Sequence, residues 1–450
     1  MSTTTESINA ISSNTIIVHG RKMEANTLLN IPSVAKSHGM KDLRDKFAGC
    51  TAVLAGAGPS LDAAIPHLKA HYGEYLLIAV DRALKPMLAA GLIPHIVCTS
   101  DMDAILMDLF TGYDIPDSVA LLWDRDCYYE VPAMWKGPLI TYDHYYDVGI
   151  WQSAFFGHRG FLCKNFTVSH TAFYVASTMG CSNVVMTGVD FAFPSKTQHH
   201  VAGAVEVGTE AKEMEVYNWV DIPGNILPSV RTTEVFSICI PSMTNAIEEA
   251  PWMKCWNTST IGARIHLAEF KAIEDALVEF SKPEDYTKRM ADCFTAPEID
   301  LHAFGVHSRY VIQTMDNILE DSTNAIDIMK RLKKIDGLRN KLLFPKWRSV
   351  FMQSVKLRDK ILSDTFSQYL LQRCMLACVH KCKEMLRPVA HLAQMAPERL
   401  AVDCSRHTML FWQFGENAKL FIHCLQRARL ALGLDPVETK WRPEPEKVTA

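Results

Sequence analysis

Short apolar segments alternate with helix-forming stretches between Thr51 and Val189, and this alternation restricts the fold more than any other feature of the chain. The apolar segments are short and rich in Val, Ile, Leu and Ala, as are strands buried on both faces of a parallel sheet. In chain order they are TAVLA, YLLIAV, HIVCTS, VALLW, PLITY and NVVMTG. Helical patterns follow the first three, and the helix-like VSHTAFYVASTMG precedes the last. The sequence therefore predicts an α/β fold with a doubly wound, Rossmann-like sheet.

The rest of the chain suggests three regions around this sheet. Residues 1–48 read as a partly flexible lead-in that contains a hairpin, NTIIVHGRKMEANTLL, and residues 49–264 contain the predicted sheet. From Ile265 onward helical patterns replace strand signals, so residues 265–435 are predicted to form an all-helical domain. Its predicted helices cover 265–280, 312–334 and 346–386. The tail, residues 436–450, is rich in proline and charge and is predicted to be disordered.

The composition is that of an ordinary globular protein of 450 residues, 48% hydrophobic and 21% charged, with a net charge of −4. A weakly acidic chain has no overall attraction for nucleic acid or for an anionic membrane, and we expect neither as a partner. No apolar run is long enough to span a membrane and the N-terminus has no signal-peptide pattern, so the expected location is cytoplasmic. The 13 cysteines are scattered singly, which favours reduced, buried thiols.

The first predicted strand runs directly into GAGPS, residues 56–60, and a helical stretch begins at Leu61. Gly56 and Gly58 permit close backbone approach, Pro59 suits a first helical turn, and free amides at a helix N-terminus attract anions. The turn lacks the third glycine of the dinucleotide fingerprint and the Lys-Ser/Thr of a P-loop. It therefore indicates either an anion site or a turn in which the glycines only shape the backbone.

Carboxylates stand at the ends of most of the other predicted strands, where ligands of open α/β sheets bind. Such groups suit ribose hydroxyls, a base edge or a metal ion. The Asp101-Met102-Asp103 triplet resembles the acid pair that holds Mg or Mn on the diphosphate of some sugar donors. The strand-end residues are Asp81, Asp101, Asp103, Asp124, Asp143 and Asp190, with Tyr142 and Gly188 beside them.

The order of three longer segments is also informative. They are AGAGPSLD, IAVDRALKPMLAAGLIPHIVCTSD and ASTMGCSNVVMTGVDFAFPSKTQHHVAG. In this order they resemble the motility-associated factor (Maf) family of flagellin glycosyltransferases, over roughly residues 40 to 275. His95 departs from the Asp that is common in that family. In APWMKCWNTSTIGARI, Thr260 and Ile261 replace an acidic residue and a glycine.

The resemblance implies an enzyme of flagellum assembly and motility with a sialyltransferase-like Rossmann domain. Its reaction would transfer a nonulosonic acid, of pseudaminic or legionaminic type, from a CMP-activated donor to Ser or Thr of flagellin. A CMP donor has one phosphate, so no cofactor is expected, and Mg or Mn on Asp101 and Asp103 is the alternative. The implied donor-binding residues are Gly56, Gly58, Pro59, Ser60 and Gly188 around the phosphate, Asp81 or Asp101 at the ribose or cytosine, and Asp103 and Tyr142 nearby.

Transfer also needs a base that takes the proton from the attacking hydroxyl, and free histidine titrates near pH 6.5. His199 and His200 follow Asp190 in a polar loop, and similar sialyltransferases use a histidine downstream of this segment. We expect one of the two histidines to be the base, with Asp190 as the next candidate. The alternative is that both are loop residues that face water. Tyr142 is either a donor to the departing phosphate or a core aromatic.

Two other functions stay open at this point. Archaeal-type pterin pyrophosphokinases resemble the same GxGPS sheet and would use ATP with Mg on Asp101 and Asp103. The other is a flagellin adaptor without catalytic activity. In the helical region, the stretch from Lys330 to Lys360 carries eleven Lys or Arg against two Asp. This stretch is either a solvated helix face or a surface that docks flagellin.

Overall fold

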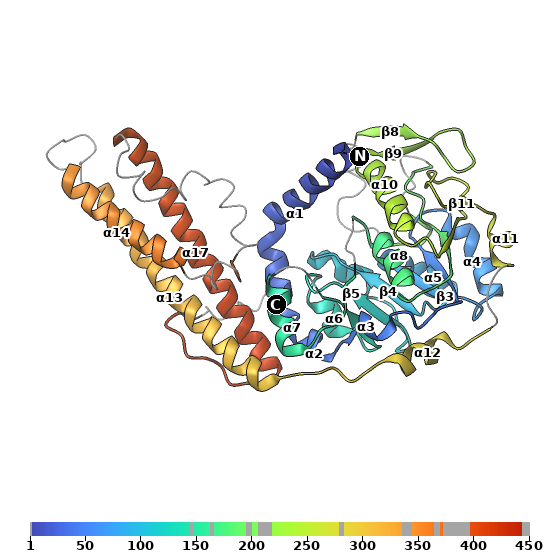
Figure 1. Ribbon diagram of the computed structural model, residues 1–450, viewed down its shortest axis with the longest axis horizontal. Coiled ribbons are helices and arrows are strands. Elements are labelled where there is room, and N and C mark those ends of the chain that lie inside the picture. The colour runs from blue at the N-terminus through green and yellow to red at the C-terminus, as the bar shows by residue number, and fades with distance from the viewer. Residues whose placement is uncertain are drawn as a thin grey trace. The chain divides into compact units, whose positions relative to one another are not determined.

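The structure is a computed structural model that describes residues 2–143, 147–162, 166–194, 200–205, 218–278, 283–334, 344–363, 370–371 and 397–442. The chain divides into two compact units (Figure 1). The α/β unit consists of Ser33–His144 and Phe156–Ile299, and the helical unit consists of Met1–Pro32, Tyr145–Phe155 and Asp300–Ala450. This division differs from the predicted one, because residues 1–32 belong to the helical unit and residues 265–299 belong to the α/β unit.

The α/β unit contains a nine-stranded sheet in which every described pair of neighbours is parallel, which confirms the predicted fold class. The strand order is β1-β6-β5-β4-β3-β2-β7-β10-β11. All six strands predicted from the apolar segments are present. The strands are β1 (His38–Gly39), β2 (Thr51–Ala55), β3 (Leu76–Val80), β4 (Ile96–Thr99), β5 (Ala120–Trp123), β6 (Leu139–Thr141), β7 (Asn183–Thr187), β10 (Lys254–Asn257) and β11 (Glu269–Phe270).

The order of the strands reverses at β2. The chain runs from β2 to β3 on one side, whereas β7 pairs with β2 on the other side, with Ala55 opposite Thr187. At such a switch point the loops that follow two adjacent strands diverge and leave room for a ligand. The GAGPS turn after β2 and the Gly188–Asp190 segment after β7 therefore emerge side by side.

Helices cover the sheet on both faces, as buried parallel strands require (Figure 1). Helix α8 packs across β2, β3 and β4, and its Phe173 joins Leu54, Ile78 and Met186 in the main hydrophobic core. The helices of this unit are α3 (Met40–Leu43), α4 (Leu61–Ala70), α5 (Asp81–Ala89), η1 (Ala104–Leu109, a 3-10 helix), α6 (Glu130–Met134), α8 (Val168–Thr178), α10 (Glu234–Glu248), α11 (Ile273–Leu277) and α12 (Tyr286–Cys293). Helix α2 (Ile31–Lys36) spans the boundary between the two units.

The helix predicted over 265–280 is wrong. Leu267 has a φ of 69°, a left-handed conformation that an α-helix excludes for a leucine. The chain then forms β11, which pairs in parallel with β10 through Trp256 and Glu269, before the short α11 begins. The antiparallel pair β8 (Trp219–Ile222) and β9 (Val230–Thr233) was not predicted from the sequence.

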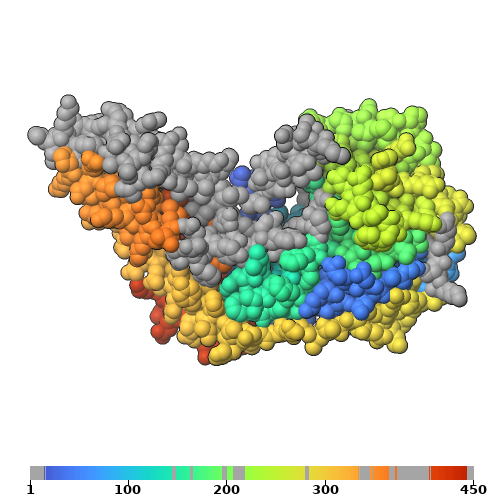
Figure 2. Space-filling view, viewed as in Figure 1, coloured from blue at the N-terminus to red at the C-terminus, as the bar shows by residue number. Residues whose placement is uncertain are grey.

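The helical unit contains α1 (Ser2–Leu29), α7 (Asp147–Phe156, nearly all of it), α13 (Leu301–Lys333), α14 (Phe344–Ser363) and α17 (Pro397–Ala431). Helices α14 and α17 both pack along α13 (Figure 2). The hairpin predicted near the N-terminus is wrong, because this segment is helical and packs against α17, with Arg21 Nη2 donating to the Glu416 carbonyl at 3.2 Å. Tertiary packing of this kind overrides the strand propensity of β-branched residues. No helix within the described ranges combines the length and apolarity needed to cross a membrane.

Eight cysteines have side chains that the structure describes; all eight are free thiols, and all but Cys293 are buried, as the sequence predicted.

Candidate functional site

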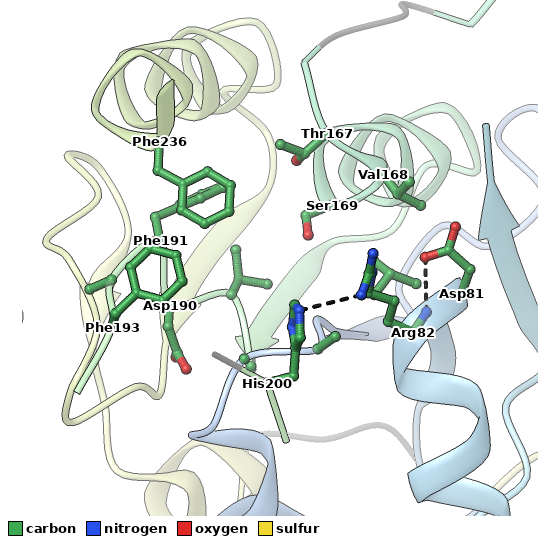
Figure 3. Close-up of a pocket in the computed structure, with 16 residues that line it drawn as sticks. Asp81, Arg82, Thr167, Val168, Ser169, Asp190, Phe191, Phe193, His200 and Phe236 are labelled. Carbon is green, nitrogen blue, oxygen red and sulfur yellow. Dashed lines mark hydrogen bonds between the residues drawn. The ribbon is translucent and has the colours of Figure 1, made fainter. Parts of the chain in front are cut away.

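A cavity of about 220 Å³ opens at the carboxyl ends of β2, β3 and β7, at the switch point of the sheet (Figure 3). Four segments converge on it: the turn after β2, the start of α5, the start of α8 and the segment after β7. One histidine and one residue of α10 complete the lining. The residues are Ala57, Gly58, Val80, Asp81, Arg82, Thr167, Val168, Ser169, Gly188, Val189, Asp190, Phe191, Ala192, Phe193, His200 and Phe236.

The GAGPS turn borders this cavity, but the backbone amides predicted to bind phosphate already have acceptors inside the protein. Gly56 N donates to the Thr187 carbonyl at 2.8 Å, and Gly58 N donates to the Gly188 carbonyl at 2.7 Å. Ser60 N donates to Asp190 Oδ2 at 3.0 Å. The prediction that the amides of Gly56, Gly58 and Ser60 bind the phosphate is therefore wrong. These amides hold the β2 turn against the β7 loop.

Asp190 supplies the anion that the N-terminus of α4 attracts. Its carboxylate accepts from both the amide and the hydroxyl of Ser60, and the Ser60 hydroxyl oxygen in turn accepts from Gly188 N at 3.1 Å. The side chain is buried, and burial raises the pKa of the Asp190 carboxyl. A carboxylate engaged in this way acts as a clamp between two loops, which weakens its assignment as the second candidate base.

This clamp needs Gly56 and Gly58 in the turn and Gly188 in the β7 loop. A Cβ added to Gly58 would lie 2.7 Å from the Gly188 carbonyl oxygen and would also meet the Asp190 carboxylate. Gly188 itself has a φ of 66°. The glycines thus allow two backbones to touch, and this is the second of the two interpretations that the sequence left open.

Arg82 brings a positive charge to the described cavity lining, and it was not among the site residues predicted from the sequence. Its Nη1 donates to His200 Nε2 at 3.4 Å and to the Val205 carbonyl at 3.5 Å. Asp81 precedes it, and the Asp81 carboxylate accepts from Arg82 N at 2.8 Å and from Thr99 Oγ1 at 2.9 Å. Burial raises the Asp81 pKa to about 6. The sequence did offer a signal for this residue, because Arg82 directly follows Asp81, the carboxylate at the end of a buried strand.

Of the two predicted base candidates, the structure places His200 in the lining of the cavity, while His199 lies outside the described residues. Because a guanidinium has no acceptor, Arg82 must donate in its contact with His200 Nε2. His200 Nε2 is then the unprotonated ring nitrogen, which is the form that a base requires. A hydroxyl that approached this nitrogen would have to displace Arg82 from it.

The N-terminus of α8 contributes Thr167, Val168 and Ser169 to the lining. The amides of a first helical turn have no acceptor within the helix, and they carry the positive end of its dipole. Figure 3 shows the Ser169 hydroxyl directed toward the space between Arg82 and His200. The cavity therefore has cationic and hydrogen-bond-donating groups on two of its sides.

Aromatic rings form another side, which lies across from Arg82 in Figure 3. The rings of Phe193 and Phe236 are stacked with centroids 5.5 Å apart and an interplanar angle of 8°. Phe191 meets Phe236 edge-to-face at 5.8 Å, and Trp219 supports Phe193 at 5.5 Å. Phe191 has a φ of 44°, an unusual conformation for a bulky residue that is typical of functional loops. We refer to Phe191, Phe193 and Phe236 as the aromatic wall.

Six predicted donor-binding residues do not line this cavity: Gly56, Pro59, Ser60, Asp101, Asp103 and Tyr142. The Tyr142 hydroxyl is buried and donates to Asp124 Oδ2 at 2.8 Å, so Tyr142 is the core aromatic that the sequence allowed as an alternative. Asp101 is exposed and accepts from the Asp103 amide at 3.0 Å in a turn before η1. Within the described part of the chain, no group of three or more His, Cys, Asp or Glu is arranged to hold a metal ion.

Comparisons with known proteins agree with the resemblance seen in the sequence. A family model described as 6-hydroxymethylpterin diphosphokinase MptE-like matches residues 25–196. Among solved structures, the chain is similar to a Maf glycosyltransferase from Magnetospirillum magneticum, with a TM-score of 0.56 and 14% identity over 91% of this chain. The chain spans 60% of the length of that glycosyltransferase. No curated protein sequence matches the chain significantly. The comparisons thus confirm the predicted Maf-like and MptE-like fold.

Proposed function

We propose that the protein is a glycosyltransferase that acts in the cytoplasm on flagellin. In the proposed reaction a nonulosonic acid, of pseudaminic or legionaminic type, passes from its CMP-activated form to Ser or Thr hydroxyls. The observation that carries the proposal is the cavity at the switch point, where a cation and a helix N-terminus face an aromatic wall. An anionic phosphate joined to a planar ring is the ligand class that such a cavity recognises.

The donor phosphate is assigned to the space between Arg82 and the first turn of α8. Arg82 supplies charge-assisted donors, and Ser169 and the α8 amides supply neutral ones. When the sugar leaves, negative charge develops on this phosphate, and fixed donors stabilise the transition state. The site proposed for the phosphate thus moves from the N-terminus of α4, which Asp190 occupies, to that of α8.

The planar base is assigned to the aromatic wall, because base–aromatic stacking supplies on the order of 1–3 kcal/mol per base. The attacking hydroxyl requires a base, and His200 or His199 retains that role in the proposal. No metal ion is needed to neutralise a single phosphate that Arg82 contacts. Because Asp101 and Asp103 lie outside the cavity lining, Mg or Mn on these residues would act elsewhere than at this phosphate.

Titration of the protein with CMP, and separately with ATP and Mg²⁺, tests the proposed donor. We expect CMP to bind, and Arg82→Gln to weaken its binding at least tenfold, because a charged hydrogen bond contributes about 1.5–3 kcal/mol. Lys85→Gln is a matched control that removes one positive charge from the same helix α5 outside the cavity lining. If wild type and Arg82→Gln bind CMP with equal affinity, the assignment of the phosphate to the space beside Arg82 is wrong.

Incubation of flagellin with CMP-activated nonulosonic acid and the enzyme, followed by intact-protein mass spectrometry, tests transfer. Loss of a general base typically lowers the rate by a factor of about 10²–10⁴ with little effect on donor binding. The double variant His199→Ala/His200→Ala should therefore bind CMP and fail to transfer sugar at an appreciable rate. An inert wild-type enzyme that still binds flagellin would favour the adaptor instead.

The alternative is an ATP-dependent pyrophosphokinase that acts on a small molecule, and the MptE-like match over 25–196 favours it. The aromatic wall suits a pterin ring as well as a nucleobase. A pyrophosphoryl donor, however, calls for divalent metal at its phosphates, and the predicted Asp101 and Asp103 ligands lie outside the cavity. Tight binding of ATP with Mg²⁺, together with no affinity for CMP, would decide for this alternative.

A further inference from the structure

Helix α8 carries a buried histidine whose contacts determine the hydrogen bonding of a cavity residue. His170 is fully buried, two positions after Val168 at the start of the helix. Its Nδ1 lies 2.8 Å from the Thr167 hydroxyl oxygen, and its Nε2 lies 3.0 Å from the carbonyl oxygen of Cys239 in α10. Thr167 lines the cavity, and its hydroxyl makes no capping hydrogen bond to the helix.

These two contacts determine the tautomer of His170. A carbonyl oxygen can only accept, so His170 Nε2 must carry a proton and donate it to Cys239. Burial lowers the His170 pKa to about 4, so the ring is neutral at physiological pH and holds this one proton only. His170 Nδ1 therefore has a lone pair and accepts, and the Thr167 hydroxyl donates its single proton to it.

The oxygen of Thr167 is left with lone pairs alone, which makes it a hydrogen-bond acceptor. A phosphate oxygen is also an acceptor, so it gains nothing from this group, whereas a ligand hydroxyl does. Figure 3 shows Thr167 between the aromatic wall and Arg82. In a nucleotide the ribose lies between base and phosphate, so the ribose hydroxyls would come to this position. This step rests on the proposed function, which assigns the base and the phosphate to those two sides.

We propose that Thr167 accepts a hydrogen bond from a ribose hydroxyl of the bound nucleotide, and that His170 is the positioning residue that turns the Thr167 hydroxyl away from the cavity. The site then distinguishes a ribose from the deoxy sugar that lacks the bound hydroxyl, whether that is the 2′- or the 3′-hydroxyl. Ser169, one residue into the helix, keeps its own proton available for the phosphate.

The test compares the affinities of CMP, 2′-deoxy-CMP and 3′-deoxy-CMP for wild type, Thr167→Val and Thr167→Ser. Wild type should bind one deoxy analogue about three- to tenfold more weakly than CMP, as expected for one neutral hydrogen bond. Thr167→Val should bind that analogue and CMP equally, and Thr167→Ser should restore the difference. The matched control Ser169→Ala should weaken all three ligands by a common factor.

If Thr167→Val discriminates between CMP and the deoxy analogue as strongly as wild type does, the proposal is overturned, but CMP remains the ligand. Failure of wild type to bind CMP would instead overturn the proposed function together with this inference, so the two failures are distinct. A second measurement needs no ligand. In ¹⁵N NMR of the wild-type protein, the His170 signals, assigned by their loss in His170→Gln, should show a neutral ring with the proton on Nε2. A proton on Nδ1 would contradict the proposal even if Thr167→Val failed to fold.

Discussion

His95 stands where the resembled family commonly has an aspartate, and its environment explains how a histidine is accommodated there. The ring is buried, stacks on Tyr72 with centroids 5.7 Å apart, and accepts from Leu77 N through Nδ1 at 2.9 Å. Burial lowers the His95 pKa to about 4, so the neutral ring serves as an acceptor for a backbone amide. An aspartate would offer an acceptor at a comparable distance from the backbone, and the position is therefore structural.

At the residue scale this burial makes stability depend on pH. In the unfolded chain His95 titrates near pH 6.5, so between pH 6.5 and 4 the unfolded state binds a proton that the folded state does not. His95 therefore contributes stability at neutral pH that is lost as the pH falls through this window. The Asp81 carboxyl, with its pKa raised from 3.8 to about 6, acts in the opposite direction, because its stabilising neutral form is lost as the pH rises.

His95→Asn keeps an acceptor for Leu77 N but cannot titrate. We expect its unfolding free energy, measured with urea and relative to wild type, to improve by about 3 kcal/mol between pH 7 and pH 4, since one pKa unit corresponds to about 1.4 kcal/mol. Asp81→Asn provides the control of opposite sign, and its relative stability should rise with pH. If His95→Asn and wild type lose stability in parallel, the histidine is not buried as a neutral ring.

At the element scale, the contact between the β2 turn and the β7 loop joins the two halves of the sheet. The amides of Gly56, Gly58 and Ser60 find their acceptors on the β7 side, and Asp190 replaces an external anion at the start of α4. A strand–turn–helix with glycines can thus use its N-terminal amides to hold a neighbouring loop. In this protein the N-terminus of α8 faces the cavity, and we propose that it binds the phosphate of the ligand.

Gly58→Ala should therefore destabilise the fold itself. The new Cβ would meet the Gly188 carbonyl and the Asp190 carboxylate, neither of which can move without breaking the clamp. We expect a loss of about 1–3 kcal/mol, seen as a lower midpoint in urea. Gly305→Ala in α13 is the control, because its Cβ would make only ordinary contacts and alanine favours the helix. If Gly58→Ala is as stable as wild type and only its CMP binding is weakened, the result would support the original prediction that the GAGPS turn binds the phosphate.

At the scale of the whole molecule, the helical unit is the part that a small-molecule enzyme does not require, and we propose that it docks flagellin. Several cations of the stretch from 330 to 360 have acidic partners, including Lys330 with Asp327 and Lys360 with Asp321. Arg339 and Lys341 lie outside the described residues. Lys334, Lys346 and Arg348 are exposed, and they form the part of this stretch that we expect to contact an acidic partner.

The triple variant Lys334→Glu/Lys346→Glu/Arg348→Glu should weaken flagellin binding, and added salt should reduce the difference from wild type. CMP affinity should not change. The control triple Lys41→Glu/Arg44→Glu/Lys254→Glu makes the same change in net charge on exposed residues of the α/β unit. Equal loss of binding in both triples would show a general charge effect and remove the docking surface from this stretch.

The sequence by itself determined those features that are encoded within a few residues. The six apolar segments became strands, and the stretches after TAVLA and before NVVMTG became α4 and α8, because burial on both faces and helical periodicity are local signals. Gly58, Asp81, Gly188, Asp190 and His200 line the cavity, as expected where parallel strands end at one edge, while their roles in binding and catalysis stay predictions.

Only the tertiary structure decided how those groups are used. Pairing of β2 with β7 placed Asp190 where a phosphate was expected, packing against α17 made the N-terminal segment helical, and the left-handed Leu267 ended a helical pattern. Arg82 and the aromatic wall met across segments distant in the sequence. The physical reason is that hydrogen-bond donors and acceptors far apart in the chain compete for one another, and only the folded geometry determines which pairs form.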